Sequence, residues 1–483
     1  MVRRNLLAVL LVLVTSGWLV WAIGAPKPEA ENTEDLFREA DRFIEILRLV
    51  QKQYVDDVDT KEMFRDAIDG MLAGLDPFSN FIPEDELNEF NKATRGKFGG
   101  IGIQIGMRYG MLTVISPIED TPAYQAGVMA GDAITEIEGK STDGIQLDDA
   151  IKTLTGEAGT KVTITVRHVT GKTETITITR AIIEVPTIKG IRRGDDNEWI
   201  YMLDDEKKIG YVRVTSFVEN SVPDLREAID SMLEKGLKGL ILDLRFDPGG
   251  ILKTAVEMTD LFVDNGVIVK TKGRATPYWE ATATKDGTLP RFPMVVLVNQ
   301  YSASASEIVS GALQDHHRAI LIGERTFGKG SVQNVIPLRG ETSALKLTTS
   351  KYYLPSGRCI HREQDMTDTD EWGVMPDIVV PMKPEEYVAL IRARQQSEII
   401  QNGLDSKKNE GGEGDGTDGE APGKDQGKPE PGPTPPMPDE FPSPDAAPAE
   451  GQAKPEPFVD RQLERALDVL RSIEVVEKYL KAA

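Results

Sequence analysis

The sequence is poor in the residues that build disulfides and metal centres. Its 483 residues include one cysteine, Cys359, so no disulfide can form within the chain and no cysteine cluster can bind a metal. The four histidines show neither an HxxxH nor an HExxH spacing; they are His168, His316, His317 and His361. The sequence therefore argues against a zinc hydrolase, and we expect no metal or other cofactor.

Positive charge is also scarce. The chain has 56 lysines and arginines against 78 aspartates and glutamates, which gives a net charge of −22. No basic patch stands out beyond Arg3 and Arg4. We therefore expect no nucleic-acid partner. A chain of 483 residues exceeds one ordinary domain, so we expect two or three domains joined by linkers.

A long apolar segment is present at the N-terminus. Arg3 and Arg4 precede residues 6–23, an almost unbroken apolar run of 18 residues, which is typical of a secretion signal and just long enough to span a bilayer. Small residues follow, but Pro26 would hinder cleavage there. We assign residues 1–25 to a signal peptide or signal anchor and favour the anchor. The bulk of the chain is then expected outside the cytoplasm, in the periplasm or an equivalent compartment.

Helical segments flank the centre of the chain. In the N-terminal region, residues 32–92, apolar spacing predicts helices over 36–54 and 61–75, either as a hairpin packed on the next domain or as a dimer contact. Residues 403–457 are acidic and rich in glycine and proline, which predicts a disordered linker. Residues 458–481 form an amphipathic helix, which we expect to dock on the N-terminal helices or on a second subunit.

Residues 95–182 indicate a separate β-rich module. A glycine loop, residues 99–102, runs into an alternating strand rather than a helix, so a dinucleotide site is excluded. The stretches GGIGIQIG, TPAYQAGVMAGDAITEIEG and LDDAIKTLTG resemble a PDZ domain, which takes a peptide C-terminus as an added strand. The resemblance implies loop amides that hold the carboxylate and a pocket for an apolar last residue. The loop residues are Gly99, Gly100, Ile101 and Gly102. The pocket residues are Leu147, Ile151 and Leu154.

Residues 183–400 indicate an α/β core. Apolar strands over 209–214, 239–244, 295–298 and 319–322 alternate with helical stretches, which predicts a largely parallel sheet.

Two residues of this core form a candidate catalytic pair. A strand, a small-residue turn and a helix place Ser304 at a helix N-terminus, where free N–H groups favour developing negative charge. Lys329 lies between two glycines in apolar surroundings, and burial would lower its pKa enough for it to act as a base. Gln333 is then expected to hydrogen-bond the amine. From the residues alone, the alternative stays open that Lys329 is an exposed lysine in a turn.

Two other interpretations of this region fail. His316 and His317 lie in a polar run after the helix, so we expect them on the surface rather than beside Ser304. The stretch from Gly323 to Gly330 is close to a P-loop. However, Gly330 stands where a magnesium-binding hydroxyl is required, and a strand pattern follows. For an oxyanion, the amide of Ala305 and the turn at Gly249 and Gly250 are the candidate donors.

Taken together, the motifs resemble the carboxyl-terminal processing proteases, which are also called tail-specific proteases. They are LDPFSNF, the PDZ module, DLRFDPGG, NQYSASASEIVSGALQD, GERTFGKGSVQ, YYLPSGRCI and GVMPDIVV. The resemblance implies Ser304 as nucleophile, Lys329 as general base and Gln333 as the residue that orients the lysine. It also implies Gly249 or Gly250, with Ala305, as oxyanion donors.

The resemblance further implies the architecture and the activity. We expect a multidomain α/β protein with a crotonase-like core, an inserted β-rich PDZ domain and helical N- and C-terminal segments. The expected function is a serine endopeptidase that cleaves envelope proteins near their apolar C-termini, gated by the PDZ domain. Homodimers through the terminal helices and an adaptor or activator protein are expected partners. The alternative is a non-catalytic PDZ scaffold in the cell envelope.

Overall fold

A computed structural model describes residues 33–84, 86–87, 96–108, 110–339, 342–363, 365–400 and 458–482. The expected signal or anchor, residues 1–25, and the expected linker, residues 403–457, lie outside these ranges. The chain divides into two compact units, one ending at Met71 and the other beginning at Leu72. Among the helices described, none combines the length and the apolar character needed to cross a membrane.

Two helices make up the described part of the first unit. Helix α2 is Thr33–Gln53 and α3 is Thr60–Ala73, close to the predicted ranges. The rings of Phe43 and Phe64 lie 6.2 Å apart, and the amide of Gln51 donates to the Thr60 hydroxyl. Both interpretations of this pair, a hairpin packed on the next domain and a dimer contact, stay predictions.

The predicted β-rich module has its own sheet and its own core. Five strands follow the order β3-β4-β5-β7-β8, with β6 beside β5 and β3 at one edge. Helices α5 and α6 cover the sheet, and β2 pairs with β9. The elements are β2 (Lys97–Gly100), β3 (Ile103–Arg108), β4 (Met111–Pro117), α5 (Pro122–Gln125), β5 (Ala133–Ile137), β6 (Lys140–Ser141), α6 (Leu147–Leu154), β7 (Lys161–Arg167), β8 (Thr173–Thr179) and β9 (Ala181–Glu184).

The α/β core is built on a sheet whose central strands are parallel, as predicted. The strand order is β10-β14-β15-β18-β19-β22, and β13 and β10 pair antiparallel with β14. The strands are β10 (Ile188–Lys189), β13 (Met202–Asp204), β14 (Ile209–Val214), β15 (Gly239–Asp243), β18 (Met294–Val298), β19 (Ile320–Gly323) and β22 (Ile378–Val379). A small ribbon, β11 (Arg192–Arg193) with β12 (Trp199–Ile200), lies outside this sheet.

Both faces of this sheet are covered. Successive side chains of a strand point to opposite faces, and the central strands are apolar on both. Val296 and Val298 pack with α7 (Ser221–Glu234), α8 (Leu252–Asp260) and α9 (Ala305–Asp315). Val295 and Leu297 pack with the C-terminal helix α11 (Arg461–Ala482).

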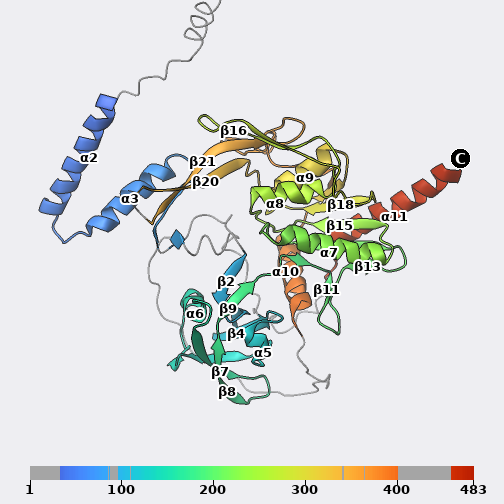
Figure 1. Cartoon of the computed structure of the whole chain (residues 1–483), viewed down its shortest axis with the longest axis horizontal. Coiled ribbons are helices and arrows are strands. Elements are labelled where there is room, and N and C mark those ends of the chain that lie inside the picture. The colour runs from blue at the N-terminus through green and yellow to red at the C-terminus, as the bar shows by residue number, and fades with distance from the viewer. Residues whose placement is uncertain are drawn as a thin grey trace, which may run out of the picture. The chain divides into compact units, whose positions relative to one another are not determined.

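Helix α11 contacts the sheet of its own core at β18 and β19, a surface that neither expectation for the C-terminal helix named. Its docking on a second subunit stays a prediction. Figure 1 shows α11, in red, beside β15 and β18. An amphipathic stripe identifies the buried face of a helix but not the surface that it covers, which explains the difference.

A second, antiparallel sheet completes the core. Its strands follow the order β1-β21-β16-β17, and β20 also pairs with β21. They are β1 (Asn80–Ile82), β16 (Val267–Lys272), β17 (Trp279–Thr282), β20 (Ser331–Pro337) and β21 (Ala344–Tyr353); helix α10 is Pro384–Glu398. This sheet brings the LDPFSNF segment next to the loop that carries Lys329.

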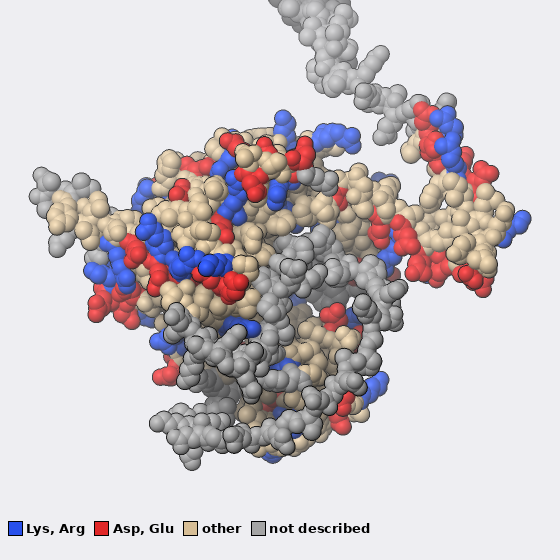
Figure 2. Space-filling model, turned by 180° about the vertical axis from the view of Figure 1, so that it is seen from behind, with Lys and Arg blue, Asp and Glu red and all other residues tan. Residues whose placement is uncertain are grey.

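Charged side chains are mixed over the surface. On the face shown in Figure 2, lysines and arginines lie among aspartates and glutamates without forming one continuous basic area.

Candidate active site

Ser304 lies directly before the first turn of α9. Its backbone has φ 55° and ψ −110°, which non-glycine residues adopt only where their surroundings hold them, at about 1–3 kcal/mol. The N–H of Ser304 donates to the Glu307 carboxylate at 2.9 Å, and the N–H of Ala303 donates to the Asp247 carbonyl at 3.0 Å. Among the described residues no acceptor binds the N–H of Ala305, which lies at the positive end of the helix.

Lys329 lies on the same cavity as Ser304. Burial, with a smaller contribution from the positive charge of Lys346, lowers the pKa of Lys329 to about 8, and Glu307 and Asp76 oppose the shift. Its Nζ lies 4.6 Å from the centre of the Phe78 ring. This direction of shift is the one that a general base requires, because an ordinary lysine is charged at neutral pH.

Glu307, which the sequence pattern did not mark, joins the serine segment to the lysine loop. Its carboxylate accepts the N–H groups of Ser304 (2.9 Å), Gly328 (2.7 Å) and Lys329 (2.8 Å), and the Thr326 hydroxyl. The side chain is fully buried, and this burial raises its pKa to about 7. One carboxylate thereby fixes the backbone on both sides of the candidate pair.

Tyr352 makes a second connection between the same two segments. Its hydroxyl lies within hydrogen-bond distance of the carbonyl of Ser304, at 3.0 Å, and of the carbonyl of Lys329. The side chain is almost fully buried beneath the cavity. The backbone positions of the serine and the lysine are therefore linked by two buried side chains.

Gln333 lines the cavity, but its amide group binds other partners than expected. The amide nitrogen donates to the hydroxyls of Ser331, at 2.9 Å, and Thr348, at 3.2 Å. The Thr348 hydroxyl in turn donates to the Asp76 carboxylate at 3.2 Å. Within the described part of the chain no hydrogen bond joins Gln333 to the amine of Lys329, so the expected contact is not formed in this structure.

The glycine turn after β15 packs directly against the serine. Gly249 has φ 98°, and a Cβ there would lie 2.6 Å from the Ala303 carbonyl oxygen. The N–H of Gly249 donates to the Asp247 carboxylate at 2.8 Å and is therefore not available to an oxyanion. Gly250, with φ 151°, has an N–H without an acceptor among the described residues. Of the two glycines, Gly250 is therefore the better candidate for an oxyanion donor.

All six core residues singled out from the sequence line one cavity of about 470 Å³. They are Ser304, Lys329, Gln333, Gly249, Gly250 and Ala305. The structure adds Lys346 and Tyr352 to the same lining. Both come from β21, more than 40 residues from the serine, which is why no local pattern marked them.

The residues expected to bind a peptide C-terminus are distributed over the PDZ-like module. Gly99 and Gly100 belong to β2, and Ile101 and Gly102 follow it with N–H groups that have no acceptor in the described ranges. Strand β3 is an edge strand, which leaves room for an added strand. On α6, Ile151 is exposed, Leu147 is partly buried and Leu154 is buried in the core of the module. Leu154 therefore offers little open surface for a pocket.

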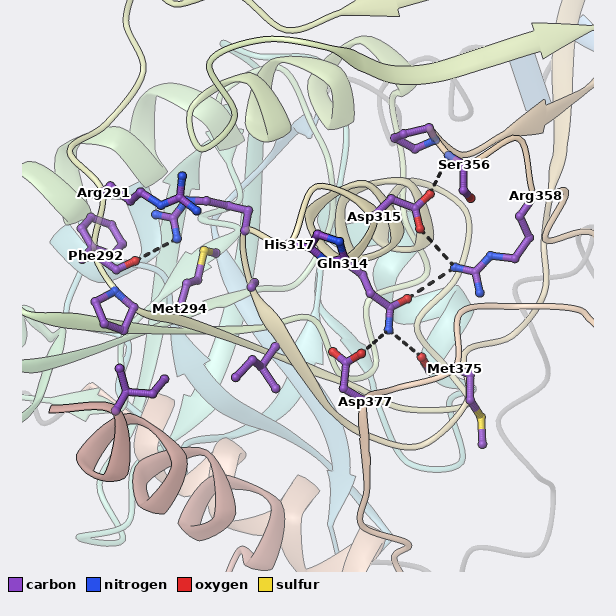
Figure 3. Close-up of a pocket in the computed structure, with 16 residues that line it drawn as sticks. Arg291, Phe292, Met294, Gln314, Asp315, His317, Ser356, Arg358, Met375 and Asp377 are labelled. Carbon is purple, nitrogen blue, oxygen red and sulfur yellow. Dashed lines mark hydrogen bonds and ion pairs between the residues drawn. The ribbon is translucent and has the colours of Figure 1, made fainter. Parts of the chain in front are cut away.

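The two adjacent histidines line other cavities. His317, with Gln314 and Asp315, lines a cavity of about 1280 Å³, and these three side chains are seen together in Figure 3. His316 binds the Val267 carbonyl at 2.7 Å. Among the residues that the structure describes, no histidine lines the cavity that holds Ser304. Within the described ranges, no three histidine, cysteine, aspartate or glutamate side chains are grouped as a metal ion would require.

Comparison with known proteins matches three parts of the chain to family models. Residues 208–380 match peptidase family S41, residues 99–179 match a PDZ domain, and residues 23–86 match the activating protease CtpB N-terminal domain. The first two matches contain the α/β core with its cavity and the β-rich module, respectively.

Among its relatives, a carboxy-terminal-processing protease of Bartonella bacilliformis is 41% identical over 80% of this chain and 85% of that protein. A probable CtpA-like serine protease of Staphylococcus aureus is 32% identical over 69% of this chain and 63% of that protein. A solved structure, the photosystem II D1 C-terminal processing protease, is 28% identical, covering 70% of this chain and 92% of that chain with a TM-score of 0.39. The chain therefore belongs to peptidase family S41, as a PDZ-containing serine-type peptidase of the carboxy-terminal-processing group.

Proposed function

We propose that this chain is an endopeptidase that uses Ser304 as nucleophile and Lys329 as general base, and that it cleaves exported proteins near their C-termini. One observation carries the proposal. Ser304 and a lysine with a pKa of about 8 line one cavity, together with two N–H groups, those of Ala305 and Gly250, that lack acceptors in the described residues.

The first step is acyl transfer. Neutral Lys329 accepts the proton of the Ser304 hydroxyl as the oxygen attacks the scissile carbonyl. The carbonyl oxygen becomes negative, and the N–H groups of Ala305 and Gly250 are placed to donate to it. No hydrogen bond joins Ser304 Oγ to Lys329 Nζ in the described structure, and such contacts commonly tighten only when substrate is bound.

The second step releases the products. Lys329, now charged, donates its proton to the leaving amine, which departs with the C-terminal part of the substrate. Neutral Lys329 then accepts a proton from a water molecule, whose oxygen attacks the ester on Ser304. Collapse of this second tetrahedral species releases the new C-terminus and returns the proton to the serine.

The upstream parts of the chain supply substrate in this proposal. The PDZ module binds the apolar C-terminus of a protein as a strand added to β3, with the carboxylate on the amides that follow β2. Occupancy of this module gates the cavity. The apolar segment at residues 6–23 supports export of the enzyme, so its substrates are proteins outside the cytoplasm.

The test compares the native full chain with Ser304→Ala and with Ser356→Ala, which removes an exposed hydroxyl elsewhere in the core. Two substrate proteins differ only in their last residue, leucine or aspartate, and mass spectrometry identifies the products. The proposal predicts cleavage near the leucine-ending C-terminus by the native chain and by Ser356→Ala, but not by Ser304→Ala. Binding of the substrate without cleavage by the native chain would instead indicate a scaffold.

A further inference from the structure

The C-terminal helix contributes to a buried cluster of charges at the end of β15. Asp243, the last residue of this strand, and Arg245, two residues further on, have side chains that are 0% and 1% exposed. Asp460, just before α11, and Arg394, on α10, complete the cluster with 12% exposure each. Two carboxylates face two guanidinium groups, so the cluster is neutral only when Asp460 is in place.

Arg245 uses every N–H of its guanidinium group in this cluster. Nε and Nη2 donate to Asp243 at 3.0 and 2.7 Å, and Nη1 and Nη2 donate to Asp460 at 2.9 and 2.8 Å. The remaining Nη1 hydrogen bond goes to the Gln462 amide oxygen at 3.0 Å. A guanidinium group has five such donors, so all are satisfied, and three of the five acceptor contacts come from the C-terminal segment.

Removal of this segment would change the cluster in two ways. Arg245 would lose its contacts with Asp460 and Gln462, and one carboxylate, Asp243, would face both Arg245 and Arg394. Ion pairs of this kind are sensitive to the loss of one partner, because the remaining charge is left uncompensated. The cluster therefore stabilises the docked position of the helix, and the docked helix stabilises the conformation of Arg245.

Arg245 begins the turn that supports the serine. Phe246, the next residue, has φ 66°, and its N–H donates to the Asn299 side chain at 3.0 Å. The following carbonyl, that of Asp247, accepts the N–H of Ala303 at 3.0 Å and the Ser306 hydroxyl at 2.9 Å. Phe246 and Asp247 thus connect the charge cluster to the Ala303 backbone and to the Ser306 side chain, on either side of Ser304.

The rest of the helix attaches to the same strand system. Ala466 and Leu470 are buried against Val295 and Leu297 of β18, the strand that leads to Ser304. The Gln462 amide nitrogen also donates to the Val380 carbonyl at 2.7 Å. Further along, Arg471 pairs with Asp204 at the surface.

We propose that the docked C-terminal helix, through Asp460 and Gln462, positions the turn from Arg245 to Gly250 beside Ser304, so that peptidase activity depends on this docking. The dependence of activity rests on the function proposed above, whereas the positioning of the turn does not. Asp460 and Gln462 are positioning residues that act through Arg245 and do not touch substrate.

The experiment uses the full chain with Asp460→Asn, which removes one charge and keeps the shape of the side chain. Arg471→Gln is the control, because it removes an ion pair of the same helix away from the cluster. Asp460→Asn is expected to accelerate hydrogen exchange of amides in residues 243–250 and 299–306. It should also lower kcat about tenfold, about 1.4 kcal/mol in the barrier, with KM within about twofold. Arg471→Gln should change neither readout.

A double-mutant cycle distinguishes an effect of Asp460 that acts through Arg245 from a general loss of stability. In an Arg245→Met background, Asp460→Asn is expected to cause no further loss of kcat. Unchanged exchange in residues 243–250 for Asp460→Asn, or an equal effect of Arg471→Gln, would overturn the inference. If Asp460→Asn does not fold, Gln462→Leu tests the same contact by the same two readouts. If the native chain proves inactive while the exchange changes as expected, the proposed function fails and the positioning role stands.

Discussion

In the proposed mechanism the most consequential single side chain is Lys329, because its amine can act as a base only when neutral. Burial lowers its pKa to about 8, and the positive charge of Lys346 contributes to the shift. Glu307 and Asp76 act in the opposite direction, so the final value reflects a balance of charges around one half-buried amine. At neutral pH the neutral form is a minority that is still large enough to support catalysis.

The pH dependence of kcat/KM follows from this balance. Below the Lys329 pKa of about 8 the rate should fall about tenfold per pH unit, because the charged amine cannot accept the serine proton, and above it the rate should level off. Lys346→Met removes a positive neighbour, so the Lys329 pKa rises and the midpoint moves to higher pH. Lys272→Met, at an exposed position of β16, is the control. An unmoved midpoint in Lys346→Met would contradict the assignment.

Glu307 is the second residue whose substitution should change both the stability of the chain and its activity. Glu307→Gln places an amide NH₂ either opposite the N–H groups of Ser304 and Lys329, which share one carboxylate oxygen, or opposite the N–H of Gly328, which binds the other. At least one of these backbone contacts is therefore lost. We expect the free energy of unfolding to fall by about 1–3 kcal/mol and kcat to fall as well, measured by denaturant unfolding and by steady-state cleavage. Glu257→Gln, which breaks an exposed pair with Lys253, should stay within about 0.5 kcal/mol. Equal changes in unfolding free energy and kcat for Glu307→Gln and Glu257→Gln would show that Glu307 does not support the site.

At the scale of elements, the site depends on how closely two strand ends approach. The turn after β15 and the turn after β18 interlock, since Gly249 leaves no room for a side chain next to Ala303 and Ser304. Neighbouring parallel strands end at one edge of the sheet, so segments more than 50 residues apart in sequence, such as those of Asp243 and Leu297, meet there.

Gly249→Ala tests this approach against a matched glycine. Gly236 has a similar backbone, φ 85°, but open space around it, whereas Gly249 has φ 98° and neighbours below 3 Å. Both substitutions should cost about 1–2 kcal/mol of stability for the left-handed conformation, and Gly249→Ala should cost more, because its Cβ would also meet backbone atoms of Ala303 and Ala305. Only Gly249→Ala should also lower kcat, by about 100-fold or more, because it displaces the oxyanion turn. Wild-type turnover by a folded Gly249→Ala chain would show that the turn has another role.

Local sequence patterns explain part of this site. The strand, small-residue turn and helix around Ser304 are read directly from residue types, as is the glycine turn at 249–250. Glu307 reads as an ordinary acidic residue in the first turn of a helix, and Tyr352 as a strand aromatic. Their roles arise from pairings between distant segments, which local spacing does not encode.

At the scale of the whole molecule, the sequence identified the modules better than their contacts. The PDZ module and the α/β core each carry a periodic pattern that predicts their strands and helices. The surface on which the C-terminal helix docks was not predicted, because its apolar stripe fits any apolar surface. The hydrogen bonds of Asp460 and Gln462 with Arg245 specify the position in which the helix docks.

Site-mapped covalent labelling of the full chain by a serine-reactive fluorophosphonate, in native and Lys329→Met forms, tests directly whether Ser304 is the nucleophile and Lys329 its base. We expect the label on Ser304 of the native chain, and we expect Lys329→Met to slow labelling by about 100-fold or more. Labelling of another residue, or labelling of Ser304 at the native rate in Lys329→Met, would contradict the assignment of nucleophile and base.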